Sequence, residues 1–333
     1  MATVSFWGKV LKYLLTSDLH FTDNPRDNYR FELFDWLLQQ QKQYNVDATF
    51  ILGDLTDGKD RHSSVLVNRI VDGLKFLKPS IYIPMGNHDY INPDMPFFYF
   101  LDHMNIWFHP RPFALDCFKI YLIPHQPDQA SLDAAFKQMP AGWTVMCHQT
   151  FAGAQSETGM PLTGFKLPPN SASAIYSGDV HAPQIVTTAN GDIVYCGSPY
   201  HVRFGDNFKP RVLLIEHGKV KNLYFPAPKK VHCTVRDVSE LPILNSGDQI
   251  KVDMELTREE MVEWENHKSA IHKFYQDAGV GVYGTKLVPP QITLKDRSQA
   301  TKSTTKSNAH YFSAFCSAEK VPSMIKKVGS NLL

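Results

Sequence analysis

The sequence predicts an α/β protein in which two packed sheets are flanked by helices (αββα), followed by a smaller α+β unit. Eight short runs rich in β-branched and aromatic residues recur between residues 12 and 216, and helical patterns separate only the first few of them. Strand–helix–strand alternation favours parallel pairing through crossovers. The later runs lack long helices between them, so we expect those strands to be antiparallel.

The expected elements follow from local patterns. Residues 31–44 (FELFDWLLQQQKQY) place apolar side chains on one face and glutamines on the other, and residues 65–77 repeat leucine and isoleucine at helical spacing. Each segment is therefore expected to form an amphipathic helix. The expected strands are residues 12–17, 48–52, 80–84, 119–124, 143–147, 174–178, 192–197 and 212–216.

A second unit is expected after residue 228. Residues 249–256 have the pattern of a strand and residues 257–279 that of a long helix. Thr257 and Glu260 are expected to form a capping box at the start of this helix, and Gly279 to end it. The expected divisions of the chain are residues 1–228, 229–290, a flexible linker at 291–308 and a C-terminal segment at 309–333.

Composition excludes several classes of protein. Apolar residues make up 43% of the 333 residues, which is typical of a globular chain, and no apolar run approaches the roughly 20 residues of a membrane span. The first residues lack the features of a secretory signal. The five cysteines are odd in number, widely spaced and free of CxxC pairs, which argues against a disulfide framework or a structural zinc. We therefore expect no membrane association and a reducing compartment, the cytoplasm.

The net charge of +1 is unevenly distributed. Residues 286–333 contain eight Lys or Arg and two Asp or Glu, so a basic tail follows a mildly acidic body. The tail has two interpretations: a contact for nucleic acid or a partner protein, and a solvated flexible tail with no partner.

Potential metal ligands follow five of the expected strands. Sites in open α/β sheets form beyond the carboxyl ends of strands, so these side chains are expected to converge on one edge. A single Asp-x-His after a strand is usually a turn, but an ordered set of carboxylates, imidazoles and one amide suits Mn²⁺, Fe²⁺ or Mg²⁺. The residues are Asp18, His20, Asp54, Asp57, Asn87, His88, Asp89, His148, Asp179 and His181.

The order D-x-H, G-D-x-x-D, G-N-H-D, H and G-x-x-H resembles the calcineurin-like metallophosphoesterase superfamily. YCGSPYHVRFGD (195–206) and the small unit with its TREE-type helix (257–260) resemble the SbcD-like exonuclease subunits of that superfamily. GDLTDGKDRHSSVLVNRI (53–70) resembles the versions carried by phages, which would place the protein in the cytoplasm of a bacterial host. The resemblance implies the two-sheet metallophosphoesterase sandwich and a small capping, DNA-binding domain at residues 229–290.

The resemblance also implies a role for each motif residue. Two divalent ions, most often Mn²⁺, would lower the pKa of the water that attacks phosphorus. His88 would protonate the leaving oxygen or orient the phosphate, and Asp89 would hold the His88 imidazole in place. One ion would be held by Asp18, His20, Asp54 and His181, and the other by Asp54, Asn87, His148 and position 179.

Position 179 departs from the family pattern. The family usually carries histidine where this chain has Asp179. One hypothesis is that Asp179 is a true ligand that shifts the preference toward Mn²⁺ or Mg²⁺ over Zn²⁺. The alternative is an ordinary turn aspartate that faces away from the site.

Other polar residues near these motifs have weaker signals. Arg61 and His62 are candidates to line the substrate groove or, equally, polar residues at a helix start. Tyr200 and Arg203 follow a GSP turn and are candidates to bind a phosphate backbone. Histidines without a ligand-like context are expected to be surface or core residues; they are His103, His109, His125, His217, His232, His267, His272 and His310.

Three functions remain open. The first is a DNA nuclease subunit with exonuclease or endonuclease activity in recombination and repair, working as a homodimer with a coiled-coil ATPase of the SbcC type. Residues 309–333 would then dock on that ATPase. The second is a stand-alone phosphatase or phosphodiesterase that needs no partner. The third is a non-catalytic scaffold, against which the retained His88 argues.

Overall fold

The computed structural model describes residues 11–77, 80–104, 106–257 and 259–289. The predicted linker and C-terminal segment, at 291–308 and 309–333, lie outside these residues. The chain divides into two compact units, Met1–Met254 with Glu265–Lys286, and Glu255–Trp264 with Leu287–Leu333. The site described below lies entirely in the first unit.

The first sheet carries the crossovers that the sequence predicts. Its strands β1 to β4 are parallel, and β11 and β12 extend the sheet in antiparallel fashion beyond β1. Helices α1 (Glu32–Tyr44) and α2 (Ser64–Phe76) pack on this sheet through a shared apolar cluster that includes Leu37 and Ile70. In order across the sheet the strands are β12 (Lys219–Leu223), β11 (Val212–Glu216), β1 (Lys12–Thr16), β2 (Ala48–Ile51), β3 (Ile81–Pro84) and β4 (Trp107–His109).

The second sheet corrects the expectation that the later strands are antiparallel. Strands β6, β7, β8 and β10 are mutually parallel, and only the edge pairs β5–β6 and β9–β10 are antiparallel. A short helix that the sequence analysis missed, α3 (Gln129–Lys137), connects β6 to β7. In order the strands are β5 (Phe113–Leu115), β6 (Ile120–Ile123), β7 (Thr144–His148), β8 (Ala174–Gly178), β10 (Gly191–Tyr195) and β9 (Gln184–Thr188).

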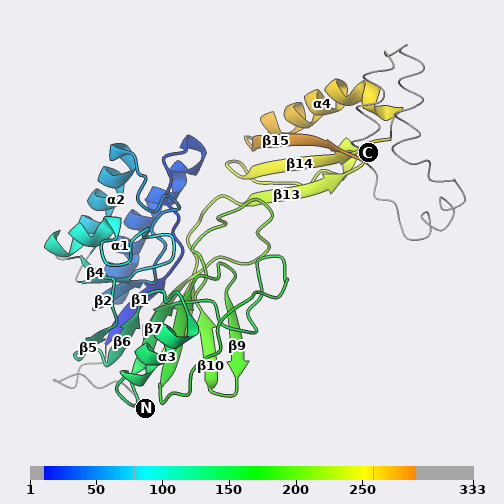
Figure 1. Ribbon diagram of the computed structural model, residues 1–333. Coiled ribbons are helices and arrows are strands. Elements are labelled where there is room, and N and C mark those ends of the chain that lie inside the picture. Colours follow the sequence, from blue (N-terminus) through cyan, green and yellow to red (C-terminus); the bar gives the residue numbers. More distant parts are fainter. Residues whose placement is uncertain (1–10, 78–79, 105, 258, 290–333) are drawn as a thin grey trace, which may run out of the picture. The chain divides into compact units, whose positions relative to one another are not determined.

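The two sheets pack face to face and form the predicted αββα sandwich. Side chains from both sheets, among them Leu15 and Phe50 of the first and Leu122 and Met146 of the second, form a continuous buried cluster. Phe136 of α3 belongs to a separate cluster with strands of the second sheet. Helices α1 and α2 therefore cover the first sheet and α3 covers the second (Figure 1).

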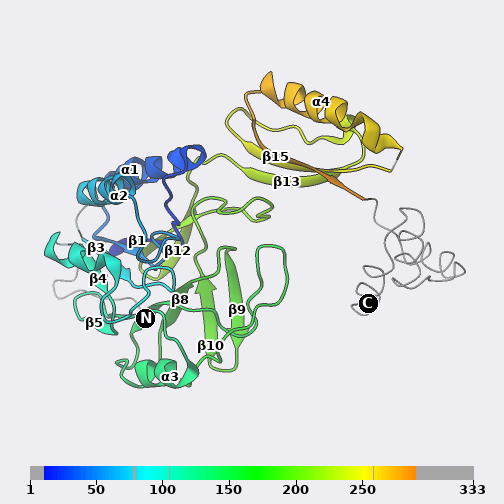
Figure 2. The same ribbon diagram turned by 45° about the horizontal axis from the view of Figure 1, so that its top comes forward.

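A three-stranded sheet follows, with β14 (Gln249–Glu255) between β13 (Lys230–Val235) and β15 (Gly281–Val288). Helix α4 (Trp264–Gln276) runs along this sheet in both views (Figures 1 and 2). The helix was expected to start at residue 257. Its α-helical part begins later because a 3-10 turn (Glu260–Glu263) comes first.

The local signals at both ends of that helix are confirmed. The Thr257 amide donates to Glu260 Oε2 at 2.8 Å and the Glu260 amide donates to Thr257 Oγ1 at 3.4 Å, which is a capping box. Gly279 adopts a left-handed φ of +68° beyond the helix end. Further 3-10 segments are Pro25–Phe31, Phe97–Met104 and Val238–Glu240, and no helix among the described residues is long and apolar enough to cross a membrane.

Candidate metal centre

Most of the candidate ligands occupy turns just after buried strands, and His148 is the last residue of β7. Four of them adopt left-handed backbone angles that non-glycine residues rarely take: Asp18 (φ 55°), His20 (43°), Asp54 (55°) and Asp179 (76°). Strained backbone of this kind persists only where the surrounding structure enforces it, and it concentrates at functional sites. Here the turns bring side chains from β1, β2 and β8 to one place.

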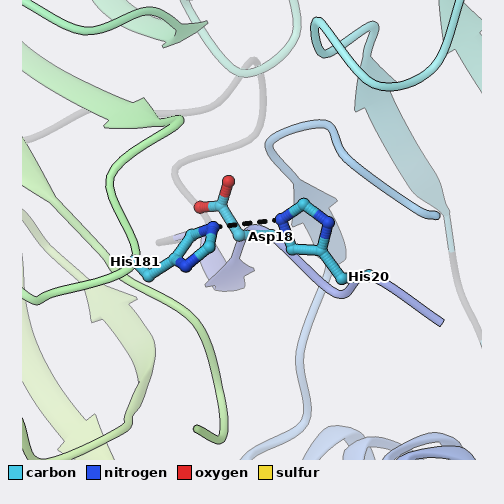
Figure 3. Close-up of side chains that lie close together, drawn as sticks. All are labelled: Asp18, His20 and His181. Atoms are coloured by element: carbon cyan, nitrogen blue, oxygen red, sulfur yellow. Dashed lines mark hydrogen bonds between the residues drawn. The ribbon is translucent and has the colours of Figure 1, made fainter. Parts of the chain in front are cut away.

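The first group joins Asp18, His20 and His181, whose candidate ligand atoms all lie within 4.8 Å of one another. Figure 3 shows the three side chains pointing toward a common centre. The Nε2 atoms of His20 and His181 are 3.1 Å apart, and all three residues are buried.

Carboxylates lie beside the far nitrogen of both imidazoles. His20 Nδ1 is 2.6 Å from Asp57 Oδ1, and His181 Nδ1 is 3.0 Å from Glu157 Oε1. A carboxylate at Nδ1 attracts the ring proton to that atom, so the Nε2 lone pair is left free. In neutral rings these two lone pairs face each other at 3.1 Å and repel, so they need a shared proton or a metal cation between them, and the group has the donor chemistry of a metal site.

The second group surrounds His148. Its Nδ1 atom lies 2.6 Å from the Leu52 carbonyl, which can only accept, so Nδ1 carries the proton and donates it. Its Nε2 atom faces three oxygens: Asn87 Oδ1 at 3.2 Å, Asp54 Oδ1 at 3.4 Å and Asp179 Oδ1 at 3.7 Å. These oxygens are acceptors, so a cation among them would satisfy the whole set.

Asp54 lies between the two groups. Its Oδ1 atom faces His148, whereas its Oδ2 atom is 3.6 Å from His20 Nε2. A carboxylate with one oxygen toward each group has the geometry of a bridging ligand. Asp18 also serves both groups, since it lies close to Asp54 and His148 as well as to His20 and His181.

The electrostatics of the cluster fit bound cations. Burial, together with the charges of Asp89 and Asp18, raises the pKa of Asp54 well above its usual value despite the opposing charge of His148. Burial lowers the pKa of His148, but the carboxylates of Asp54, Asp179 and Asp18 outweigh it and raise that pKa to about 9. Buried acids this close to one another cannot all ionise without a counter-charge, which divalent cations would supply.

Two glycines allow the ligand loops to pack closely against one another. A Cβ atom on Gly86 would lie 2.2 Å from Asp54 Oδ1, and one on Gly178 would lie 2.4 Å from the Leu52 carbonyl and 2.8 Å from His148 Nδ1. A side chain at either position would displace a ligand. The glycines of G-N-H-D and of YSGDVH are therefore required by the packing of the site.

The structure corrects the expected role of Asp89. This fully buried carboxylate accepts three backbone hydrogen bonds, from the amides of Asp54 (2.8 Å), Leu55 (2.9 Å) and Gly86 (2.8 Å). Both of its oxygens thus accept hydrogen bonds from the loops that carry Asp54 and Asn87. Asp89 holds the backbone of these loops rather than the His88 imidazole.

His88 lies at the rim of the site. Its amide donates to Asp54 Oδ1 at 2.9 Å, and its side chain is 35% exposed. The ring centroid is 5.4 Å from that of His20, and the Nδ1 atom is 3.8 Å from Asp57 Oδ1. An imidazole at the open rim can meet a substrate without being a ligand.

The four predicted substrate contacts lie in different environments. Tyr200 is wrongly predicted, because it is fully buried and its hydroxyl donates to the Leu19 carbonyl. His62 contacts Thr56 Oγ1 at 2.6 Å and packs on Phe97, while Arg61 is exposed. Arg203 is exposed and lines a cavity that also includes Asp57.

Two residues near the site escaped the sequence analysis. Glu157 stands in a long loop with no strand end beside it, so no local pattern singles it out. His125 lies two residues after the end of β6, the same signal that identified the ligands, yet it was expected to be a surface or core histidine. Its ring centroid lies 6.4 Å from that of His148, and its Nδ1 atom lies 3.0 Å from the Tyr90 hydroxyl.

A cavity of about 620 Å³ lies beside Asp57. Its lining includes Arg26, Arg203, Phe204 and Lys251. A second cavity, of about 370 Å³, shares the last three of these residues and adds Tyr283 and Lys286. We call the combined space the basic trough; all of its lining residues belong to the first unit.

Comparison with known proteins decides the family. The model of the calcineurin-like phosphoesterase family matches residues 11–183, which include every candidate ligand described above. The chain belongs to the calcineurin-like phosphoesterase family. Members of this family hydrolyse phosphoesters at dimetal sites, in keeping with the two ligand groups of this structure.

Solved structures show distant similarity. An archaeal phosphodiesterase shares 13% identity over 65% of this chain and 100% of its own, with a TM-score of 0.37. A dimetal phosphatase from Danio rerio shares 11% identity over 64% and 98%, with a TM-score of 0.41. A purple acid phosphatase from yellow lupin seeds shares 12% over 65% and 53%, with a TM-score of 0.39. No curated protein matches the chain.

Proposed function

We propose that this phosphoesterase is a metal-dependent nuclease that hydrolyses phosphodiester bonds of DNA. The observation that carries the proposal is the basic trough beside Asp57, because Asp57 is the carboxylate partner of the candidate ligand His20. A small phosphoester needs only the metal centre. A polyanion needs cationic surface that continues away from it.

The residues of the chain have distinct tasks in this proposal. Asp18, His20 and His181 would hold one divalent ion, Asn87, His148 and Asp179 the other, and Asp54 would lie between the two. When bound, the ions supply Lewis acidity and lower the pKa of the attacking water. His88, at the rim, would donate a hydrogen bond to the phosphate or a proton to the leaving oxygen.

The donor set favours Mn²⁺. Asp179 Oδ1 is 3.7 Å from His148 Nε2, and its Oδ2 accepts a hydrogen bond from Thr150 Oγ1 at 2.6 Å. The carboxylate is thereby turned toward the second ligand group, and oxygen-rich shells suit Mn²⁺ or Mg²⁺ better than Zn²⁺. This orientation supports the ligand hypothesis for Asp179 over the turn hypothesis.

The charges of the trough support a nucleic-acid substrate. Arg203 is exposed and Lys251 is half-buried, and among the described residues neither forms an ion pair, whereas Arg26 and Lys230 of the same lining pair with Asp27. Unpaired cations along a groove are the usual means of binding a phosphate backbone. The proposal extends to residues 229–290 as a DNA-binding unit, since Lys251 belongs to β14.

The partner proposals rest on the resemblance to SbcD-like subunits. We propose a homodimer that works with a coiled-coil ATPase of the SbcC type in DNA recombination and repair. Pull-down of such an ATPase by the full chain, and its loss on removing residues 309–333, would test this assignment.

The substrate proposal is tested by comparing two substrates. Arg203→Ala and Lys251→Ala are assayed with Mn²⁺ on linear duplex DNA and on bis(p-nitrophenyl) phosphate, which reaches only the metal centre. We expect kcat/KM for DNA to fall at least about tenfold while that for the small diester stays within about twofold. Equal losses on both substrates, or no loss on DNA, would contradict the proposal and favour a stand-alone phosphatase or phosphodiesterase.

A further inference from the structure

This inference rests on the proposed nuclease function and specifies how the substrate is held. Phe204 and Tyr283 lie together in the basic trough, with ring centroids 6.1 Å apart and planes inclined by 46°. Tyr283 is 41% exposed and Phe204 is half-buried. The two rings are therefore not packed face to face, and part of their surface is open to the cavity.

Cations surround this aromatic pair. Arg26 Cζ is 5.8 Å from the Phe204 ring centroid and 5.9 Å from that of Tyr283, and Lys251 Nζ is 4.6 Å from Phe204. Cation–π contacts hold the cations against the rings. They leave the cations' remaining hydrogen-bond donors available to phosphate oxygens.

The backbone that presents Phe204 is fixed in advance. Asp206 Oδ2 accepts hydrogen bonds from the amides of Val202 (2.8 Å) and Arg203 (2.9 Å), and Gly205 closes the turn with a φ of +92°. Residues at such a turn lose little conformational entropy when a ligand binds.

Lys251 and Lys286 also line the cavity that holds Tyr283. The Lys251 stem passes beside Gly284, where an added Cβ atom would make only ordinary van der Waals contact with Lys251 Cγ at 3.5 Å. Among the described residues, Lys286 also forms no ion pair, and it lines the same cavity. Aromatic surface and cations thus occur together in the trough, which reaches Asp57 beside the metal centre.

We propose that Phe204 and Tyr283 form a stacking site for an unpaired nucleobase, with Arg26 and Lys251 binding the adjacent phosphates. A base has two flat π-faces, and its nucleotide carries the negative charge that the cations require. Paired bases within a duplex hide these faces. The strand that enters the trough is therefore single-stranded or unpaired at this point.

Binding is measured separately from cleavage. A His88→Ala background with Mn²⁺ is used, and fluorescence anisotropy compares a labelled oligo-dT with an abasic oligomer of equal length. Stacking requires bases, whereas phosphate binding does not. We expect tighter binding of oligo-dT, and a loss of about 5- to 100-fold in Tyr283→Leu and Phe204→Leu that lowers its affinity to the abasic level. Tyr283→Phe should retain the wild-type preference.

A matched control comes from elsewhere on the surface. Tyr224 is 46% exposed, and Lys209 Nζ lies 3.8 Å from its ring centroid, but the residue lies outside the trough. Tyr224→Leu should leave both affinities unchanged. Lys251→Met should weaken binding of both oligomers, because it removes a phosphate contact.

Two other results would each contradict the stacking site. Equal wild-type affinity for oligo-dT and the abasic oligomer would mean that the trough binds only the backbone, and the nuclease proposal would stand. Binding of neither oligomer would remove the nucleic-acid assignment as well. Turnover of bis(p-nitrophenyl) phosphate by the unmutated protein then shows whether the metal centre itself is a phosphodiesterase.

Discussion

The Nε2 atoms of His20 and His181 lie 3.1 Å apart, and each ring has a carboxylate beside its Nδ1 atom. The two carboxylates come from different loops, Asp57 after β2 and Glu157 from the loop between β7 and β8. Each sets the tautomer of one histidine. In the first ligand group a carboxylate therefore lies behind each imidazole, which would leave both Nε2 atoms free to bind a cation.

Removal of the Glu157 charge tests this arrangement. Glu157→Gln should weaken Mn²⁺ binding about 10- to 100-fold, the usual effect of losing a partner behind a metal-bound histidine. Isothermal titration of the metal-free protein with Mn²⁺ measures the affinity directly. Met160→Ala, at an exposed position in the same loop, is the control and should bind Mn²⁺ like the unmutated protein. An unchanged affinity in Glu157→Gln would remove Glu157 from the site.

Substitutions at position 179 test the proposed metal preference. Asp179→Ala should sharply lower the Mn²⁺ content, and Asp179→His should shift the preference toward Zn²⁺, because imidazole replaces a hard oxygen donor. Elemental analysis after equilibration with equal concentrations of both metals gives the ratio. A full Mn²⁺ content in Asp179→Ala would show that Asp179 is an ordinary turn residue.

Asp89 should matter for stability even without metal. Asp89→Ala leaves the amides of Asp54, Leu55 and Gly86 without their shared acceptor in a buried place. We expect a loss of at least about 2 kcal/mol in the free energy of unfolding, measured by urea denaturation in EDTA. Asp133→Ala, on an exposed face of α3, is the control. A loss as small as that of the control would refute the structural role.

The free energy of unfolding should depend on pH through His109. Burial lowers its pKa from 6.5 to about 4, and among the described residues its Nε2 atom has no hydrogen-bond partner. The unfolded chain therefore binds a proton before the folded protein does. This contribution is complete above pH 6.5 and is lost as the pH falls toward 4, by at most about 3 kcal/mol.

The variant His109→Phe isolates this effect, because phenylalanine keeps the stacking on Phe113, whose ring centroid is 4.4 Å away. Between pH 7 and pH 5 the urea midpoint of the unmutated protein should fall further than that of the variant. Acid effects at the metal centre are common to both proteins and cancel in the comparison. Parallel declines would show that His109 does not titrate as described.

Much of the fold was predictable because its signals are local. All eight expected strands and both early helices are present, since each depends on a short hydrophobic pattern. The direction in which strands pair depends on the connections between them, so short sequence patterns did not predict it. The nine-residue helix α3 carries the β6–β7 crossover, and a helix this short is hard to distinguish from a loop by its periodicity.

The same distinction holds at the site. The residues of the ligand motifs converge because strand ends in a sheet share an edge. The destinations of individual side chains depend on tertiary packing instead. Asp89 turns inward to three amides, Tyr200 is buried against the Leu19 carbonyl, and Glu157 reaches His181 from a distant loop. None of these contacts leaves a pattern in the sequence.

Metal-dependent cleavage of DNA at this site with the help of His88 is tested most directly by digestion of end-labelled linear duplex DNA with Mn²⁺. The unmutated protein is compared with His88→Ala and with an EDTA control. We expect a ladder of products that requires both Mn²⁺ and His88. Intact DNA alongside rapid hydrolysis of a simple aryl phosphoester would contradict it.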